Sequence, residues 1–282
     1  MMTRRTFIKT TSFASFAALM SPRILRAATL NKNIGLQLYT LRDAISRDLP
    51  GTIASISAIG YTWLEAAGYN DGKFYGLQPR EFKKMADDLG MQLISSHATF
   101  EPEQQQQAIE AHATLGVRYL VYPMLPVNKK ETKDHFSRAA AHLNDIGEAC
   151  RASGLKFGYH NHAFEFVKID DTTGFDILLE LTDSELVCFE SDLYWMIYAG
   201  SDPLSYFGKY PGRFELWHVK DMEANPEKDF APVGTGIIDY KQIFGQKQQA
   251  GLAYFFVEQD DCKIDPLESV KISFKNLKKI VY

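Results

Sequence analysis

The sequence is poor in cysteine and carries no strong excess of charge of either sign. Its three cysteines in 282 residues, Cys150, Cys188 and Cys262, include no close pair of the kind that a zinc knuckle or a short disulfide loop would need. We therefore expect all three to be buried as small hydrophobic side chains. The net charge of −4 gives no basic surface for nucleic acid or an anionic membrane, so neither is expected as a partner.

The apolar run near the N-terminus is too short to span a bilayer. It extends from Phe13 to Met20, after the pair Arg4-Arg5 and before Ala27-Ala28. This order of basic pair, apolar run and small residues is the layout of a twin-arginine export signal. We predict that residues 1–28 form a cleavable signal and that the mature protein is periplasmic and free of the membrane. A disordered basic tail is the alternative.

No glycine-rich phosphate loop follows the first predicted strand, and no linker rich in Pro, Gly or Ser divides the chain. The first absence disfavours an open doubly wound sheet, and the second favours one domain over two. Strand-like and helix-like segments instead alternate eight times. The predicted strands are 33–41, 62–68, 91–97, 117–123, 156–162, 186–192, 213–218 and 253–258. The predicted helices are 50–59, 79–89, 102–115, 130–153, 173–182, 202–207, 239–249 and 266–281. We predict a single α/β domain, a (β/α)8 TIM barrel, over residues 33–282.

The last four predicted strands each end in a side chain that can bind a metal. These side chains are His160 or His162, then Asp192, His218 and Glu258. Because the carboxyl ends of the strands in such a barrel meet at one rim, the four should gather there. A buried carboxylate needs a partner, and metal ligation provides one. We predict a divalent metal site, and a mixed set of imidazoles and carboxylates suits Zn²⁺, Mn²⁺ or Co²⁺.

Residues two positions from these ligands share their face of the strand. His162, Glu190 and Lys220 are therefore expected at the same rim. A metal with open coordination positions would hold two adjacent sugar oxygens and acidify the neighbouring C–H by stabilising an enediolate. Glu258 is the predicted carrier of that proton.

Other polar residues on the strands are predicted to lie near the substrate. His97 ends the third predicted strand, Glu65 lies in the second and Gln37 in the first, and all three are predicted substrate contacts. Glu165, three residues beyond His162, is predicted to orient a histidine ligand. The remaining histidines fall on predicted helices among polar neighbours and are expected to be solvated: His112, His135 and His142.

Several motifs around these residues resemble the sugar phosphate isomerase/epimerase superfamily of xylose isomerase-like barrels. The most specific are Tyr159-His160-Asn161-His162, Ser191-Asp192, Trp217-His218-Val219-Lys220-Asp221, Val257-Glu258 and the glycine-rich stretch from Pro232 to Asp239. The resemblance extends from Asn33 to the C-terminus. The superfamily includes D-tagatose 3-epimerase-like enzymes and inosose dehydratase, so the resemblance implies a TIM barrel that acts on carbohydrate.

The resemblance also implies which residues bind the metal. Family members hold it with Glu, Asp, His and Glu from strands five to eight. Asp192, His218 and Glu258 match the last three ligands, but His160 stands where many members have Glu. The epimerases use their two metal-bound glutamates as bases, and this chain keeps only one. Aromatic residues, among them Trp195, replace the polar residue that usually follows Asp192, and Trp195 is a predicted substrate contact.

We predict a metal-dependent isomerase or epimerase of a non-phosphorylated keto-sugar that works through an enediolate. If the reaction needs a second base, His162, Glu165 and Lys220 are the candidates. The alternative is a lyase or dehydratase that eliminates across a 3-keto-glycoside or an inosose. A carbohydrate-binding barrel without catalysis is an alternative of another class. The sequence leaves a homo-oligomer open.

Overall fold

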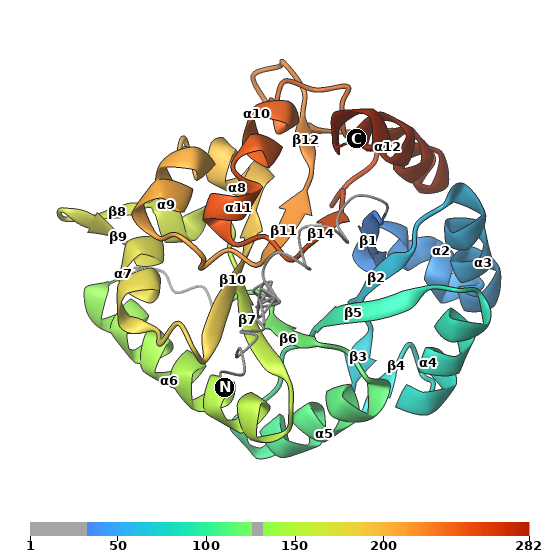
Figure 1. The fold of residues 1–282 in the computed structure, drawn as a ribbon, viewed down its shortest axis with the longest axis horizontal. Coiled ribbons are helices and arrows are strands. Elements are labelled where there is room, and N and C mark those ends of the chain that lie inside the picture. The colour runs from blue at the N-terminus through green and yellow to red at the C-terminus, as the bar shows by residue number, and fades with distance from the viewer. Residues whose placement is uncertain (1–32, 126–131, 282) are drawn as a thin grey trace, which may run out of the picture.

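Eight parallel strands close into a barrel (Figure 1). The computed structural model describes residues 33–125 and 132–281, and the predicted signal at residues 1–28 lies outside them. Around the barrel the strands follow the order β1, β14, β11, β10, β7, β6, β5, β2. They are β1 Gly35–Gln37, β2 Trp63–Ala66, β5 Gln92–His97, β6 Tyr119–Tyr122, β7 Lys156–His160, β10 Val187–Asp192, β11 Leu216–Val219 and β14 Tyr254–Val257. The predicted TIM barrel is confirmed, and the doubly wound alternative is wrong.

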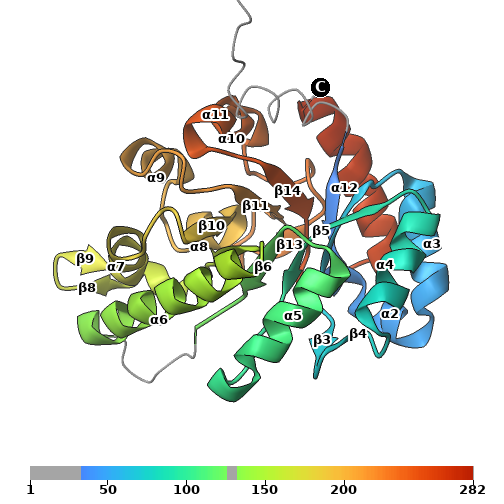
Figure 2. The same ribbon diagram turned by 60° about the horizontal axis from the view of Figure 1, so that its bottom comes forward.

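Helices surround the barrel on the outside, as Figures 1 and 2 show. They are α2 Arg42–Arg47, α3 Leu49–Ile59, α4 Pro79–Asp88, α5 Gln105–Leu115, α6 Lys133–Ala152, α7 Gly174–Leu181, α8 Leu193–Tyr198, α9 Pro203–Lys209, α10 Tyr240–Gly245, α11 Lys247–Ala250 and α12 Pro266–Val281. The strands are buried on both faces, which is why they are apolar without strict alternation. None of the helices in the described ranges is long and apolar enough to cross a membrane.

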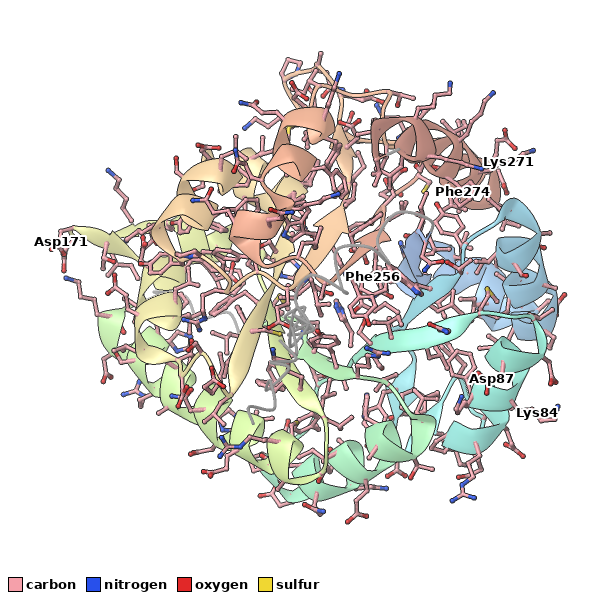
Figure 3. The ribbon with its side chains drawn as sticks, viewed as in Figure 1. Lys84, Asp87, Asp171, Phe256, Lys271 and Phe274 are labelled. Carbon is pink, nitrogen blue, oxygen red and sulfur yellow. The ribbon has the colours of Figure 1, made fainter. Side chains whose placement is uncertain are left out.

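Close packing inside the barrel requires glycine at one position of β1. A Cβ atom on Gly35 would lie 2.4 Å from the ring of Phe256 and 2.5 Å from the carbonyl oxygen of Phe255. Phe256 lies inside the barrel, whereas the charged side chains of Lys84, Asp87 and Lys271 lie on its outer ring (Figure 3). The close approach of β1 to β14 therefore leaves no room for a larger residue.

The first predicted strand is much shorter than expected. Only Gly35–Gln37 is extended, and Leu38–Leu41 forms the 3₁₀ helix η1. The side-chain oxygen of Gln37 accepts a hydrogen bond from the backbone N–H of Tyr39, which starts this turn. Helices α2 and α8 were not predicted either. Helix α8 begins directly after Asp192, whose Oδ1 accepts from the N–H of Trp195 and caps the helix.

Three short antiparallel pairs extend from the loops and were not predicted. They are β3 Tyr69–Asn70 with β4 Lys73–Phe74, β8 Lys168–Ile169 with β9 Thr172–Thr173, and β12 Asp221–Met222 with β13 Phe230–Ala231. Each strand has two residues, too few to give a periodic pattern in the sequence.

Two burial predictions were wrong. His112 was expected in solvent but is fully buried, because it lies on the inner face of α5 while its polar sequence neighbours lie on the outer face. Its ring nitrogens contact the carbonyl oxygen of Ala108 and the hydroxyl of Ser96, and burial lowers the pKa of His112 to about 4. Cys262 was expected to be buried but is partly exposed, since it lies in the loop after β14.

Candidate metal centre

Polar side chains from four strands meet at the carboxyl ends of the barrel. His160 ends β7, Asp192 ends β10, His218 lies in β11, and Glu258 follows β14. A pocket of about 380 Å³ opens above them. Its lining includes His97, His160, His162, Trp195, Lys220, Glu258 and Asp260, together with Tyr39 and Tyr69. In TIM barrels this end of the strands is where active sites are built.

Three of the four predicted metal ligands come together in an outer layer beside the pocket, and the fourth, His160, adjoins them. Donor atoms of Asp192, His218 and Glu258 lie within 4.8 Å of one another. The Nδ1 atom of His218 is 2.7 Å from Oε2 of Glu258. The Nε2 atom of His160 is 3.5 Å from Oδ2 of Asp192, so the fourth residue adjoins this group, while its donor atoms also belong to a second group with His97, Glu190 and His218. Two imidazole nitrogens therefore face two carboxylates.

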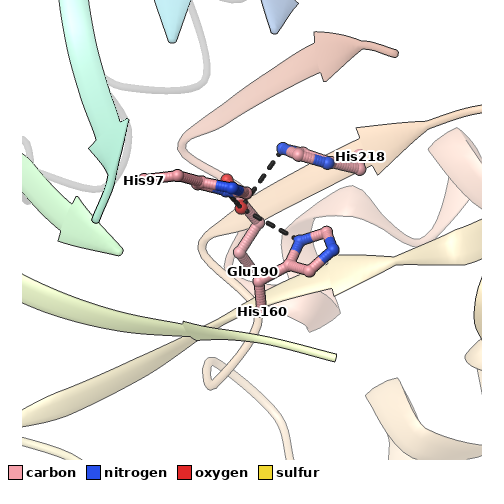
Figure 4. A group of neighbouring side chains, drawn as sticks. All are labelled: His97, His160, Glu190 and His218. Carbon is pink, nitrogen blue, oxygen red and sulfur yellow. Dashed lines mark hydrogen bonds and ion pairs between the residues drawn. The ribbon is translucent and has the colours of Figure 1, made fainter. Parts of the chain in front are cut away.

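A second, inner layer lies deeper in the barrel and centres on Glu190. Its Oε2 atom is 2.6 Å from Nε2 of His97, 3.1 Å from Nδ1 of His160 and 3.2 Å from Nε2 of His218 (Figure 4). These four residues form another group with the donor atoms of a divalent metal site, in which His97 is partly exposed to the pocket and the other three are buried. Sequence reasoning placed Glu190 at the rim but did not count it among the ligands.

Glu65 completes the inner layer from the opposite wall. Its Oε2 atom lies 2.5 Å from Nε2 of His218 and accepts a hydrogen bond from Nε2 of Gln37 at 2.9 Å. Both residues are fully buried and do not line the pocket, so neither predicted substrate contact is placed against the substrate space. The Oε1 atoms of Glu65 and Glu190 have no hydrogen-bond partner in the part of the chain that the structure describes.

Lys220 contributes a buried ammonium group to the outer layer. Its Nζ atom lies 2.7 Å from each of three carboxylates, those of Asp192, Glu258 and Asp260. Although burial disfavours the charge, these neighbours hold the pKa of Lys220 well above its usual value. Burial likewise opposes the charge of Glu258, but Lys220 and His218 hold the pKa of that carboxyl well below its usual value. Asp260 was not among the predicted residues, because it lies beyond the end of its strand.

The loop after β13 holds Lys220 in place through its neighbour Asp221. The buried carboxylate of Asp221 accepts hydrogen bonds from the backbone N–H groups of Gly234, Gly236 and Ile238. A Cβ atom on Gly236 would lie 2.3 Å from Oδ1 of Asp221, so the loop must have glycine there to wrap around the carboxylate. Tyr240, just after the loop, donates to the carbonyl oxygen of Lys220.

His162 and Glu165 are placed differently from the ligands. His162 lines the pocket, and burial lowers its pKa to about 3, so that its imidazole is neutral. Glu165 is buried behind it, where its carboxylate accepts from the hydroxyl of Tyr159 at 2.6 Å and from the backbone N–H of His162 at 2.9 Å. Glu165 therefore contacts the backbone of His162 and not the ring of a histidine ligand. Burial raises the pKa of Glu165 to about 7.

Comparison with known proteins shows the family. A match to the xylose isomerase-like TIM barrel covers residues 53–280. The chain belongs to this family. It is 29% identical to a sugar phosphate isomerase/epimerase from Parabacteroides distasonis, a structure that superposes with a TM-score of 0.78 over 88% of this chain and 94% of that one. The structure of an IolI protein with a zinc atom has the same fold, with a TM-score of 0.71 and 15% identity over 88% of this chain and 98% of that one.

Curated members of the family include inosose dehydratases. The enzyme from Lacticaseibacillus casei is 31% identical over 156 residues, which are 49% of this chain and 52% of that protein. The chain thus spans about half the length of the curated relatives that it matches. The family contains sugar isomerases, epimerases and dehydratases, and the buried histidines and glutamates at the mouth of this barrel have the donor chemistry of a divalent metal site.

Proposed function

We propose that the protein is a metal-dependent sugar isomerase or epimerase that acts on a non-phosphorylated keto-sugar through an enediolate. The observation that carries the proposal is the convergence of two imidazoles and two carboxylates beside a pocket of about 380 Å³. His160, Asp192, His218 and Glu258 would hold Zn²⁺, Mn²⁺ or Co²⁺. When bound, such an ion supplies Lewis-acid stabilisation of negative charge on the sugar oxygens. The zinc in the IolI structure supports this assignment.

Glu258 is the group best placed to move the substrate proton. It lines the pocket, and its low pKa keeps it ionised at neutral pH, as a base requires. Lys220 lies 2.7 Å from it and offsets its charge in the buried site. His162, which is neutral and also lines the pocket, is available as a second base. Glu165 does not line the pocket, so its role is to hold the backbone of His162 in place.

The second candidate function is a lyase or dehydratase for an inosose or a 3-keto-glycoside. Two observations favour it. His160 leaves only one glutamate, Glu258, in the outer layer, whereas epimerisation with two bases uses two glutamates. The curated relatives are inosose dehydratases. Elimination needs one base to remove a proton next to a carbonyl and an acid to protonate the leaving oxygen. In such a lyase Glu258 would be the base, and the protonated Lys220 would be the acid.

One experiment separates these functions. Metal-loaded protein is incubated in D₂O with keto-sugars and, separately, with keto-glycosides and an inosose, and products are followed by mass spectrometry. Deuterium in an isomerised or epimerised sugar supports the first function, and loss of water or of an aglycone supports the second. Binding of the sugar without exchange or elimination would contradict both and indicate a carbohydrate-binding barrel. We further propose that the protein works in the periplasm after twin-arginine export, as the segment from Arg4 to Ala28 indicates.

A further inference from the structure

We propose that Glu190 and Glu65 are positioning residues that fix the orientation and tautomer of the two histidine ligands, and that His160 and Glu190 form one functional unit. The inference rests on the proposed metal site in the outer layer. The relevant observation is that His160 and His218 each stand between two layers of carboxylates. Each ring presents one nitrogen to the inner layer and the other nitrogen to the outer layer.

With an ion bound in the outer layer, the inner carboxylates are the acceptors for the remaining N–H of each ring. A neutral imidazole has one N–H donor and one lone pair, and an ionised carboxylate only accepts. The Nδ1 atom of His160 lies 3.1 Å from Glu190, and the Nε2 atom of His218 lies 2.5 Å from Glu65. Both nitrogens of His218 face a carboxylate, since its Nδ1 atom is 2.7 Å from Glu258, so Nε2 is the one donor of that ring when an ion in the outer layer takes the lone pair of Nδ1. The lone pairs are then on Nε2 of His160 and Nδ1 of His218. These are the atoms that face Asp192 and Glu258 in the outer layer.

The inner carboxylates are themselves held in place. Gln37 donates to Oε2 of Glu65 at 2.9 Å, and its own side-chain oxygen accepts from the backbone of Tyr39, a residue that lines the pocket. Glu190 lies directly across from His160 in the pairing of β10 with β7. His218 lies directly across from Asp192 in the pairing of β10 with β11. The sheet register therefore builds both layers, with β10 supplying a carboxylate to each. Carboxylates that accept the second N–H of a metal-bound histidine orient the ring and make it more basic.

The arrangement also explains why histidine and not glutamate suits position 160. A glutamate there would bring a third buried carboxylate against Glu190, which has no cation within contact distance in the described part of the chain other than histidine. Two like charges in a buried site cannot both ionise without a large cost. His160 instead gives Glu190 an N–H and gives the outer layer a lone pair. Restoring the more common family ligand should therefore fail unless Glu190 is neutralised as well.

The test measures zinc affinity by competition with a chelator for the wild type, Glu190→Leu and Glu65→Leu. We expect a loss of about 10- to 100-fold in each variant, the usual effect of losing such a carboxylate. Glu165→Leu is the matched control, because Glu165 is equally buried at the same end of the barrel but contacts no ligand ring. Its affinity should stay within about threefold of the wild type. Equal losses in all three variants would indicate general destabilisation and overturn the proposal.

A double-variant cycle tests the functional unit. His160→Glu should bind zinc more weakly than the wild type and unfold at a lower temperature. The double variant His160→Glu with Glu190→Gln should bind zinc at least about tenfold more tightly than His160→Glu alone. Additive effects of the two changes would contradict a unit.

Nitrogen-15 NMR of the zinc-loaded wild type reports the tautomer of each histidine directly, so this test does not depend on whether a variant folds. We expect a protonated Nδ1 in His160 and a protonated Nε2 in His218. The opposite tautomers would place the ion in the inner layer and overturn the proposal. Wild-type protein that binds no metal would overturn the proposed function together with this inference. Normal binding with unaffected variants would overturn the inference alone.

Discussion

The Nζ atom of Lys220 lies 2.7 Å from Oδ2 of Asp192, so a buried ammonium contacts one of the residues that we assign to the metal. The same nitrogen is equally close to Glu258 and to Asp260. A divalent ion bound by Asp192 and Glu258 would be repelled by this charge. The cost limits metal affinity, but the ammonium also keeps the two carboxylates ionised and ready to bind.

Removing the charge of Lys220 should therefore tighten metal binding. At a separation of 4 Å, two unit charges interact with about 4 kcal/mol at an effective dielectric constant of 20. We expect Lys220→Met to raise zinc affinity by about tenfold or more at pH 8 and to lower turnover. Lys263→Met removes an exposed lysine that pairs with Glu223 and Asp229, and it serves as the control. Unchanged or weaker zinc binding in Lys220→Met would show that the lysine does not oppose the ion.

Changes at Asp192 separate its two roles. Oδ1 of Asp192 caps helix α8 through the N–H of Trp195, and Oδ2 faces the outer layer. Asp192→Asn can keep the cap but loses the charge, whereas Asp192→Ala loses both. We expect zinc affinity to fall at least tenfold in both variants, because each weakens or removes one of about four ligands. Only Asp192→Ala should lose a further ~1 kcal/mol of stability from the missing cap. Full zinc occupancy by elemental analysis in both variants would refute the assignment.

The fold could be predicted from the sequence because its signals are long and repeated. Apolar segments of six to nine residues alternate with amphipathic ones, and that alternation predicts parallel strands covered by helices. Features that depend on a few residues were missed. Helix η1 replaced the second half of the first predicted strand, since the turn depends on one side-chain hydrogen bond from Tyr39 to Gln37.

The site could be predicted in outline for a similar reason. Residues at strand ends must meet at the rim, so His160, Asp192, His218 and Glu258 could be grouped without coordinates. Depth within the barrel could not be inferred. Glu65 and Gln37 look like rim residues in the sequence, yet they lie beneath the histidines, because the register of β2 against β1 sets their height. The contact of Lys220 with Asp260 depends on a loop conformation that no periodic pattern encodes.

Glu165 should make stability depend on pH. Burial raises the pKa of Glu165 from its ordinary value of 4.5 to about 7. Between pH 4.5 and pH 7 the folded protein therefore keeps a proton on Glu165 that the unfolded chain has lost. This contribution to the free energy of unfolding is fully present below the pKa that Glu165 has in the unfolded chain, and it is lost as the pH rises through about 7. Its magnitude is about 3 kcal/mol. Glu165→Gln has no such group. The free energy of unfolding of the wild type relative to Glu165→Gln, measured in urea with a chelator present, should fall from pH 5 to pH 8. A constant difference would show that Glu165 stays ionised throughout.

Export should depend on the arginine pair near the N-terminus. Replacing both Arg4 and Arg5 with Lys keeps the charge but removes the paired guanidinium groups of the motif. We expect the precursor to remain in the cytoplasm, as measured by cell fractionation and immunoblotting. Replacing Arg23 and Arg26 with Lys changes the same number of arginines in the same segment and should leave export intact. Normal processing of the first variant would exclude the twin-arginine route.

Glu258→Gln tests the proposed base separately from the metal site. Glutamine keeps the shape of the side chain and an oxygen donor, but it cannot take up a proton at neutral pH. We expect zinc binding to weaken while some remains, because His160, Asp192 and His218 are unchanged, and we expect proton abstraction to fall by about 10²-fold or more. The measurement is the rate of deuterium incorporation at the substrate carbon in D₂O under saturating zinc. His162→Gln is the matched comparison, since His162 lines the same pocket from the loop after β7. If Glu258→Gln exchanges deuterium at the wild-type rate and His162→Gln does not exchange it, His162 is the base and the proposed role of Glu258 is wrong. If both variants lose exchange, the reaction uses two proton carriers.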